Sequence, residues 1–205
     1  MAFSGAPTLL VVSDTHGSRN VLSAVFAWGM RRKVRAIAFL GDGEKDVDEA
    51  LALSACDLPW LRVRGNGDTD HSIPHADILD LGGRRFFLCH GHLHGVQDGF
   101  GPLISAARSL GAQAALYGHT HIPYWEEMDG MLVLNPGSLG RPRSSTGPTF
   151  ATIECPADEW FKIVHWSVHP GPLGRYRIRS VVTDSSVGTD SSVGADSSVP
   201  CPDQG

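Results

Sequence analysis

Short runs of apolar residues recur along the first third of the chain, and each is bounded by polar or turn-forming residues. Residues 8–12, 36–40 and 60–63 form such runs, which is the pattern of strands buried on both faces. Between them, residues 18–33 and 44–54 carry apolar side chains at helical spacing. Strand and helix therefore alternate, which predicts a parallel α/β sheet.

Beyond residue 70 the pattern changes from crossover helices to pairs of strands. Two glycines at residues 82–83 separate two strand-like segments, which predicts a hairpin. The expected elements are strands over residues 76–81, 84–89, 114–117, 125–128, 131–134, 150–155 and 160–168, and a helix over residues 103–110. Helices combined with parallel and antiparallel strand pairs predict a two-sheet α/β sandwich, in a single domain over residues 1–170.

The end of the chain differs in kind. From Asp184 it repeats a six-residue unit three times, as Asp-Ser-Ser-Val-Gly-Thr, Asp-Ser-Ser-Val-Gly-Ala and Asp-Ser-Ser-Val-Pro-Cys, with one valine in each. So little apolar surface does not offset the entropy lost on ordering. The segment before these repeats contains three alternating arginines, Arg175, Arg177 and Arg179. It predicts either a last edge strand or a basic linker, and the linker is favoured. We therefore expect residues 171–205 to form a linker and a disordered low-complexity tail.

Composition and charge narrow the class of protein. The chain has 205 residues, of which 41% are hydrophobic, and a formal net charge of −5. That charge supplies no positive field for a nucleic-acid backbone, so a nucleic-acid partner is not expected. The four cysteines are widely scattered, which fits a reducing cytoplasm. We expect no secretory signal and no membrane span, because no run of about 18 apolar residues occurs.

Five polar segments stand out because each directly follows a predicted strand. They are Asp14-Thr-His16, Gly41-Asp42, Gly65-Asn66-Gly-Asp68, His90-Gly-His92 and Gly118-His119-Thr-His121. Ligand sites in open α/β sheets form outside the carboxyl ends of the strands, so these segments are expected to converge. Residues two apart in extended backbone share a face, so each Asp-x-His or His-x-His pair can point at one ligand.

Two aspartates, one asparagine and four histidines in one place predict a metal centre. Clustered carboxylates need compensating cations, and neutral imidazole is the commonest metal ligand. Oxygen and nitrogen donors without sulfur suit manganese, iron, zinc, cobalt or nickel. Seven ligands exceed what one such ion takes, so two divalent ions that share a carboxylate are expected. Paired ions leave a net positive charge that favours an anionic phosphate ester, and such pairs support in-line displacement at phosphorus.

The ordered motifs, followed by Asn135-Pro-Gly-Ser138, resemble the calcineurin-like metallophosphoesterase superfamily, and most closely its small bacterial phosphodiesterase branch. The resemblance covers residues 8–168 and implies a four-layer α/β sandwich of two mixed β-sheets flanked by helices. It implies a metal-dependent phosphoesterase, more a phosphodiesterase than a phosphomonoesterase, that activates water for attack on a small phosphoester. By this similarity, one ion is bound by Asp14, His16 and His121, the other by Asn66, His90 and His119, and Asp42 bridges them. Manganese is the favoured ion.

The sequence departs from many superfamily members at Gly67, where they carry a histidine that protonates the leaving group. His92 and His94 are the candidates to replace it, and His92 is favoured for contact with the substrate. Asn66 is expected to help hold the phosphoryl group, and Arg141 and Arg143 either reach a substrate phosphate or belong to a solvated loop. Other histidines, such as His165, are expected at the surface or at caps.

Each motif alone is common in turns, so turn chemistry is the plain alternative for every one of them. Their combination favours catalysis. A second alternative is a non-catalytic metal-binding scaffold or interaction module of the same fold, as in the scaffold subunit of retromer, which departs from the ligand set. A nuclease ranks last because no long Lys/Arg cluster is present. The physiological substrate and the oligomeric state leave no trace in the sequence.

Overall fold

Two mixed β-sheets pack face to face in the computed structural model, which describes residues 5–54, 56–181 and 197–199. The larger sheet has the strand order β12-β11-β10-β9-β1-β2-β3. Its strands are β1 (Thr8–Val12), β2 (Ala36–Phe39), β3 (Trp60–Arg62), β9 (Thr149–Glu154), β10 (Lys162–Pro170), β11 (Tyr176–Val181) and β12 (Ser197–Val199). Strands β1, β2 and β3 run parallel, and the others pair antiparallel.

The smaller sheet has the order β4-β5-β6-β8-β7. Its strands are β4 (Ala76–Leu81), β5 (Arg84–Cys89), β6 (Ala114–Leu116), β7 (Pro123–Met128) and β8 (Met131–Pro136). Strands β5, β6 and β8 run parallel in its centre, and β4 and β7 are antiparallel edges. The hairpin expected around the glycine turn is present, with Ala76 paired to Cys89 and Leu81 to Arg84.

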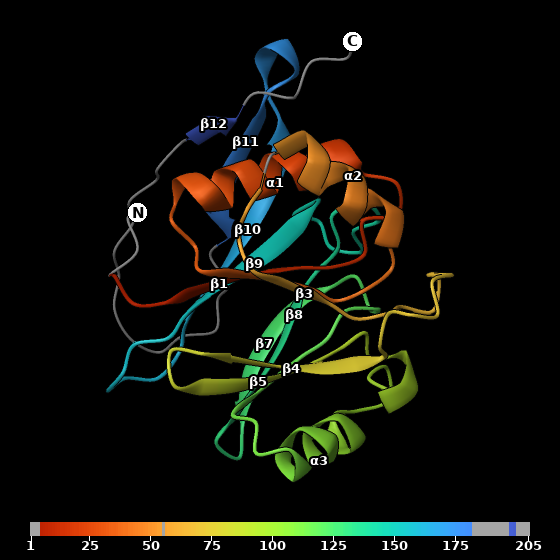
Figure 1. Cartoon of the computed structure of the whole chain (residues 1–205), viewed down its shortest axis with the longest axis vertical. Helices are drawn as coiled ribbons and strands as arrows, with labels where there is room; N and C mark the ends of the chain where they lie inside the picture. Colours follow the sequence, from red (N-terminus) through yellow and green to blue (C-terminus); the bar gives the residue numbers. More distant parts are fainter. Residues whose placement is uncertain (1–4, 55, 182–196, 200–205) are drawn as a thin grey trace.

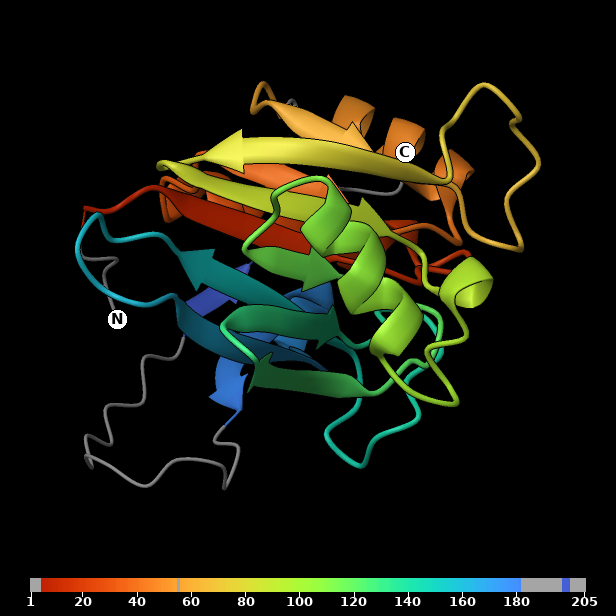
Figure 2. The same cartoon turned by 90° about the horizontal axis from the view of Figure 1, so that it is seen from below.

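Helices cover the outer face of each sheet, which gives the four layers seen in Figure 1 and, from below, in Figure 2. Helices α1 (Arg19–Arg31) and α2 (Glu44–Ser54) lie on the larger sheet, and α3 (Gly101–Ser109) lies on the smaller one. The predicted fold class, a four-layer sandwich of two mixed sheets in one domain, is therefore confirmed.

Strand β1 shows why the central runs are wholly apolar. Leu10 and Val12 pack in the cluster under α1 and α2, whereas Leu9 and Val11 pack in the cluster between the two sheets. All four side chains are fully buried. Alternate residues of a strand point to opposite faces, and both faces of this strand meet a packed layer. A strand with one solvent face would instead alternate apolar and polar residues.

The carboxyl ends of five strands meet at one edge of this sandwich. Strands β1, β2 and β3 of the larger sheet and strands β5 and β6 of the smaller sheet each end directly before one of the five polar segments. The backbone connects these ends, because the N–H of Asp14 donates to the carbonyl of Gly41 at 2.9 Å and that of Gly118 to the carbonyl of His90 at 3.0 Å. The polar segments therefore converge as expected.

The C-terminal part differs from the expected linker. Residues Tyr176–Val181 form β11, which pairs with β10 from Pro170 to His165, and Ser197–Val199 form β12 on its outer edge. Ile178 is fully buried in the core under the helices, and this anchor makes a sheet strand of a segment we expected to be solvated. The tail predicted to be disordered otherwise falls on residues 182–196 and 200–205, which lie outside the described residues. No helix in the described ranges is long and apolar enough to cross a membrane.

Candidate metal centre

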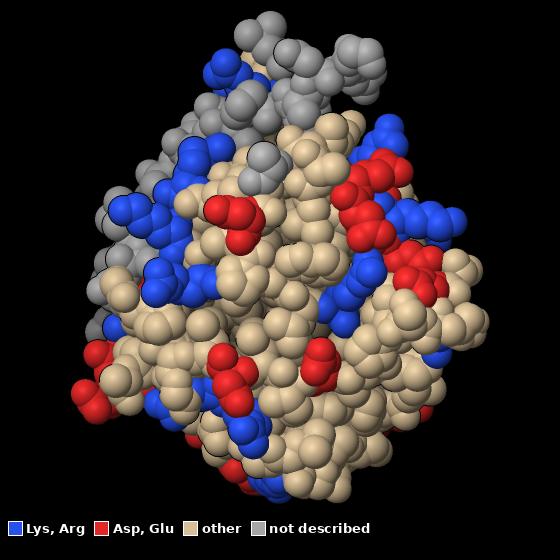
Figure 3. Space-filling model, viewed as in Figure 1, with Lys and Arg blue, Asp and Glu red and all other residues tan. Residues whose placement is uncertain are grey.

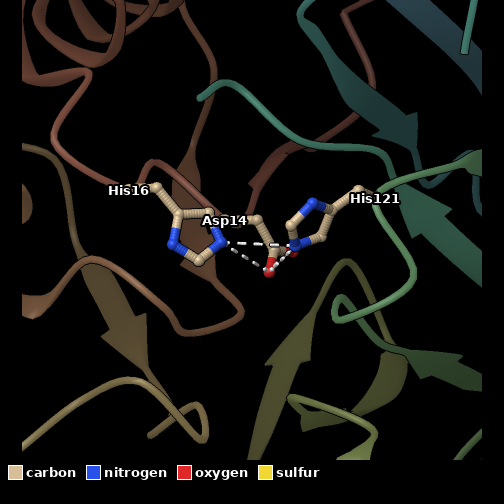
Figure 4. Close-up of side chains that lie close together, drawn as sticks. All are labelled: Asp14, His16 and His121. Atoms are coloured by element: carbon tan, nitrogen blue, oxygen red, sulfur yellow. Dashed lines mark hydrogen bonds and ion pairs between the residues drawn. The ribbon is translucent and has the colours of Figure 1, made fainter. Parts of the chain in front are cut away.

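Asp14, His16 and His121 point toward one another at the meeting edge of the two sheets (Figure 4). Nε2 of His121 lies 3.1 Å from Oδ1 of Asp14, and Nε2 of His16 lies 3.8 Å from the same oxygen. The two Nε2 atoms are 3.3 Å apart. These three ligand atoms are close enough to one another to share one ion.

A second group adjoins the first and shares Asp14 with it. Asp14, Asp42 and His90 each offer one ligand atom there, and all three residues are buried. Nε2 of His90 lies 3.9 Å from Asp14 Oδ1 and 3.7 Å from Asp42 Oδ2. The Asn66 side-chain oxygen, Oδ1, is 3.2 Å from the same imidazole nitrogen. Asp42 Oδ2 is also 3.8 Å from His16 Nε2, so it lies between the histidines of both groups.

Backbone carbonyls fix the orientation of two of these imidazoles. The Nδ1 atom of His90 lies 2.7 Å from the carbonyl of Leu40, and Nδ1 of His121 lies 2.7 Å from the carbonyl of Arg141. A carbonyl only accepts hydrogen bonds, so Nδ1 carries the proton and the Nε2 lone pair faces the carboxylates. Metal-binding histidines are held in this way by a second ring of partners.

Asp14 supplies the clearest sign that the site is built for a cation. Its side chain is fully buried, and among the described residues its Oδ1 atom has no hydrogen-bond partner. Its Oδ2 atom, in contrast, accepts hydrogen bonds from the Ser13 hydroxyl at 2.5 Å and the His119 backbone N–H at 3.1 Å. A buried carboxylate oxygen without a donor is costly. A divalent ion supplies the missing partner, and the oxygen and imidazole donors around it suit such an ion.

The backbone is strained at five of the expected metal ligands. Asp14, His16, Asp42, His119 and His121 all have positive φ angles, from 42° to 66°. Residues other than glycine seldom adopt this region, and aspartate and histidine enter it more readily than most. Five such residues in one place mark a region that the surrounding structure holds under strain, which is typical of functional sites.

Two glycines allow the loops to approach closely. A Cβ atom on Gly118 would lie 2.1 Å from the Ser13 Oγ atom, and one on Gly65 would lie 2.0 Å from Asp42 Oδ1. Gly118 follows a strand of the smaller sheet and Ser13 a strand of the larger one. The glycine therefore lets the two sheets meet at the ligand loops.

Asp68 positions the Asp42 loop, a role that sequence reasoning missed. Its carboxylate accepts backbone hydrogen bonds from Asp42, Gly43 and Gly65 at 2.8 Å and from Glu44 at 3.0 Å. Burial alone would raise the pKa of this carboxyl, but the four N–H donors outweigh burial and lower it. Asp68 stands in the Gly-Asn-Gly-Asp motif, which is the one signal that could have identified it.

Asp46 and Glu44, at the start of α2, fasten neighbouring loops in the same way. Asp46 accepts hydrogen bonds from the Thr15 hydroxyl at 2.5 Å and from the Gly17 N–H at 2.7 Å. Glu44 accepts from the Thr69 and Asp70 N–H groups, at 3.0 and 2.7 Å. Nothing in the sequence separates these two acids from ordinary acidic residues in the first turn of a helix.

His119 and His92 lie beside the ligand groups. The ring centroid of His119 is 5.2 Å from that of His90, and the Gln97 side-chain amide nitrogen is 2.9 Å from His119 Nε2. His92 does not continue the strand, because residues His92–His94 turn into a short 3-10 helix. Its ring centroid is 5.4 Å from that of His90. His94 faces the Phe87 ring instead, at 5.6 Å.

The pKa values of the histidines in this region shift in two directions. Burial lowers the pKa of His16 and of His119, and burial together with the imidazoles of His90 and His119 lowers the pKa of His92 to about 4. The pKa of His121 is raised, because the neighbouring Asp14 carboxylate favours the charged imidazole more than burial disfavours it. Neutral imidazoles are the form that binds metal ions.

The remaining expected site residues lie at the rim. Arg141 and Arg143 are exposed, and the charge of Arg141 acts on His16 while that of Arg143 acts on His121. Both guanidinium groups therefore lie within electrostatic reach of the centre. Next to His16 and Asp42, a cavity of about 290 Å³ opens to solvent, which leaves room for a small ligand.

Two residues outside the ligand set are buried. Cys89 is buried, and burial raises the pKa of its thiol to about 12. His165, expected at the surface or at a cap, is only 2% exposed. Its Nε2 donates to the carbonyl of Asn135 at 2.7 Å, and the Asn135 amide donates to the carbonyl of Gly118 at 2.7 Å. His165 thus supports the loop that carries the His119 and His121 motif.

Comparison with known proteins agrees with this geometry. The model of the calcineurin-like phosphoesterase superfamily domain matches residues 8–158. The probable metallophosphoesterase YsnB of Bacillus subtilis is 31% identical over 145 residues, which cover 71% of this chain and 82% of YsnB. The phosphodiesterase YfcE of Escherichia coli is 28% identical over 161 residues, which cover 75% of each chain.

A solved structure extends the likeness to three dimensions. The crystal structure of a predicted phosphoesterase from Streptococcus pneumoniae superposes with a TM-score of 0.69 at 27% identity, and the match covers 87% of this chain and all of that one. Family model, relatives and fold thus agree with the converging aspartates and histidines. The chain belongs to the calcineurin-like phosphoesterase superfamily.

Proposed function

We propose that the chain is a phosphodiesterase that binds two divalent metal ions, manganese in the first place, and hydrolyses a small phosphodiester. The family, the relatives and the Asp/His groups support the coarser statement, a metal-dependent phosphoesterase. The preference for a diester draws on the name of the YfcE relative alone. The observation that carries the proposal is Asp14 Oδ1, which is buried, lacks a donor and is surrounded by three imidazoles.

The proposed ligand sets follow the two groups of side chains. Asp14, His16 and His121 would hold one ion, and Asn66, His90 and His119 the other, with Asp42 between them. The position of Asp42 supports a bridge, because its Oδ2 is 3.8 Å from His16 and 3.7 Å from His90. Its Oδ1 accepts the Gly67 N–H at 2.7 Å, which orients the other oxygen toward the ligands. Asp14 also belongs to both groups and is a second candidate for sharing.

When bound, such ions would polarise the phosphoryl oxygens, stabilise the developing charge and lower the pKa of water, which is the chemistry that in-line hydrolysis needs. The chain would contribute orientation. Asn66 is exposed at the edge of the centre, where its amide can hold a phosphoryl oxygen. Arg141 and Arg143 would neutralise the remaining charge of the ester, and His92 borders the same space beside His90 and His119.

Gly67 gives the leaving group no protonating histidine. Esters whose alcohol departs without protonation are therefore the expected substrates, because a pKa of about 4 leaves the candidate donor His92 neutral. The surface supports a small ester. On the face in Figure 3, acidic side chains are interspersed among the basic ones, which differs from the continuous basic groove that a nucleic-acid strand needs.

The free thiols of Cys56, Cys89 and Cys155 support a reducing compartment, and we keep the cytoplasm as part of the proposal.

The test compares hydrolysis of bis-p-nitrophenyl phosphate and p-nitrophenyl phosphate by metal-stripped protein supplied with manganese, zinc, nickel or no metal. We expect turnover that depends on metal and is faster on the diester. Asp42→Asn should lower kcat/KM at least about thousandfold, because a neutral amide does not bridge two cations. Asparagine tolerates the positive φ of 59° at this position, so the fold should survive.

Asp129→Asn is the matched control. Asp129 also has a positive φ, of 52°, but lies in the β7–β8 turn at the opposite edge of the sheet, where its side chain is 87% exposed. Its activity should equal that of the wild type. A wild-type rate in folded Asp42→Asn would refute the bridging role. A folded protein that binds metal but hydrolyses neither ester would favour the non-catalytic scaffold.

A further inference from the structure

A second hollow adjoins the candidate metal centre, between the loop that precedes α3 and the start of β7. This cavity has a volume of about 300 Å³ and is lined by Val96, Phe100, Tyr117, Ile122, Tyr124 and Arg143. We call it the aromatic pocket. It is separate from the hollow beside His16 and Asp42, with which it shares no lining residue.

Rings and aliphatic groups form most of its wall. The rings of Phe100 and Tyr124 are stacked with centroids 5.3 Å apart and an angle of 26° between their planes. Tyr117 packs against Phe100 at 5.4 Å. Val96 and Tyr117 are buried, whereas the large apolar side chain of Ile122 is 48% exposed. The pocket thus offers apolar surface that is open to solvent, which is the composition of small-molecule sites.

The aromatic pocket borders the loop that carries two of the proposed metal ligands. Thr120, which also lines it, lies between the proposed ligands His119 and His121. The amide of Gln97, another lining residue, is 2.9 Å from the His119 imidazole. The backbone N–H of Arg143 donates to the carbonyl of His121 at 3.1 Å. A ligand in the pocket therefore touches the same loop that carries two metal ligands.

We propose that the aromatic pocket binds a planar apolar group of the substrate, an aryl or heteroaryl ester group, while the phosphoryl group lies at the metal centre. The proposal rests on the proposed function and adds the class of ester. The ring faces and aliphatic groups recognise a flat apolar group. A lone guanidinium at the edge, from Arg143, matches the single negative charge of a phosphodiester.

The size of the pocket decides how much discrimination to expect. A methyl group attached to phosphorus would leave most of the cavity to water, whereas a phenyl group would remove apolar wall from water. Burial of one ring against such a wall should strengthen binding by about tenfold or more. The prediction concerns the difference between two ligands with the same charged head, so metal binding cancels from the comparison.

The experiment measures the affinity of the manganese-loaded protein for phenylphosphonate and methylphosphonate by titration calorimetry, which needs no turnover. In the wild type, phenylphosphonate should bind at least about tenfold more tightly. Ile122→Ala and Phe100→Ala should each reduce this ratio by about threefold or more, with the Kd for methylphosphonate changed less than twofold. Ile122 is half exposed, so its truncation should leave the fold intact even if Phe100→Ala does not fold.

Leu110→Ala is the matched control, because Leu110 is 47% exposed and does not line the pocket. It should keep the wild-type ratio. Equal Kd values for the two phosphonates in the wild type would overturn the proposal, as would a ratio that survives Ile122→Ala or falls equally in Leu110→Ala. If diester hydrolysis is present in any of these cases, the proposed function stands and only the pocket assignment fails. If no metal supports hydrolysis, the proposed function itself fails.

Discussion

The two sheets contribute different chemistry to the centre they share. Loops of the larger sheet carry all the oxygen donors, Asp14, Asp42 and Asn66, together with His16. Loops of the smaller sheet carry only imidazoles, those of His90, His119 and His121. Neither sheet alone offers all seven donors of the proposed pair of ions. The centre is therefore a property of the packed sandwich, more than of either sheet.

The two loop sets are also fastened differently. Acidic side chains hold those of the larger sheet, because Asp68, Asp46 and Glu44 accept backbone N–H groups there. Contacts across the sandwich hold those of the smaller sheet. His90 Nδ1 contacts the carbonyl of Leu40, which follows β2, and the His119 N–H donates to Asp14. The difference teaches that packing between the sheets positions the imidazoles of the smaller sheet, whereas carboxylates on loops of the larger sheet position its oxygen donors.

Asp14→Asn should have the largest effect, because Asp14 joins both groups. We expect kcat/KM for a diester to fall at least about thousandfold and manganese to lose its stabilising effect in thermal unfolding. The metal-free variant should unfold at a higher temperature than the metal-free wild type, since a neutral amide removes one of two neighbouring buried carboxylates. A variant that still gains stability from manganese would show that Asp14 is not a shared ligand.

Asp68→Asn should have an intermediate effect. It tests whether the carboxylates that accept backbone N–H groups position the loops of the larger sheet. The amide oxygen can accept only part of the four N–H bonds, and it lacks the charge that strengthens them. We expect the free energy of unfolding to fall by about 1–3 kcal/mol and activity to fall by about 10–100-fold. Urea unfolding and diester kinetics measure the two. Asp48→Asn, at an exposed position of α2, should change neither, and an unchanged Asp68→Asn would refute the positioning role.

The smallest expected effect is that of His165 on the free energy of unfolding, and it depends on pH. Burial lowers its pKa, so the unfolded chain binds a proton more readily than the folded protein. The stabilisation by neutral His165 is therefore complete above about pH 6.5 and is lost as pH falls below it, by at most about 1.4 kcal/mol per pH unit. Unfolding free energies between pH 5 and 7 measure this slope. His165→Gln keeps a donor for Asn135 and should flatten the curve, and an unchanged slope would assign it to other groups.

Local pattern was enough to predict the strands and the edge at which the site forms. The run from Thr8 to Val12 is buried on both faces, so its apolar sequence predicts a buried strand. The motif residues come directly after it. The roles of Asp68 and Asp46 depend on contacts with residues 24 to 31 positions away, which no local pattern encodes. The buried state of His165 and the sheet position of Ile178 depend on tertiary packing in the same way.

The left-handed backbone at five of the proposed ligand positions has a consequence for evolution and for engineering. Glycine, asparagine and aspartate adopt the positive φ angles of these loops with little strain. Valine, isoleucine or threonine would be forced into a sterically forbidden conformation there. Substitution of the proposed ligands by other residues that tolerate a positive φ angle can thus abolish metal binding while the fold is kept. An inert descendant that still folds is only a handful of such exchanges away.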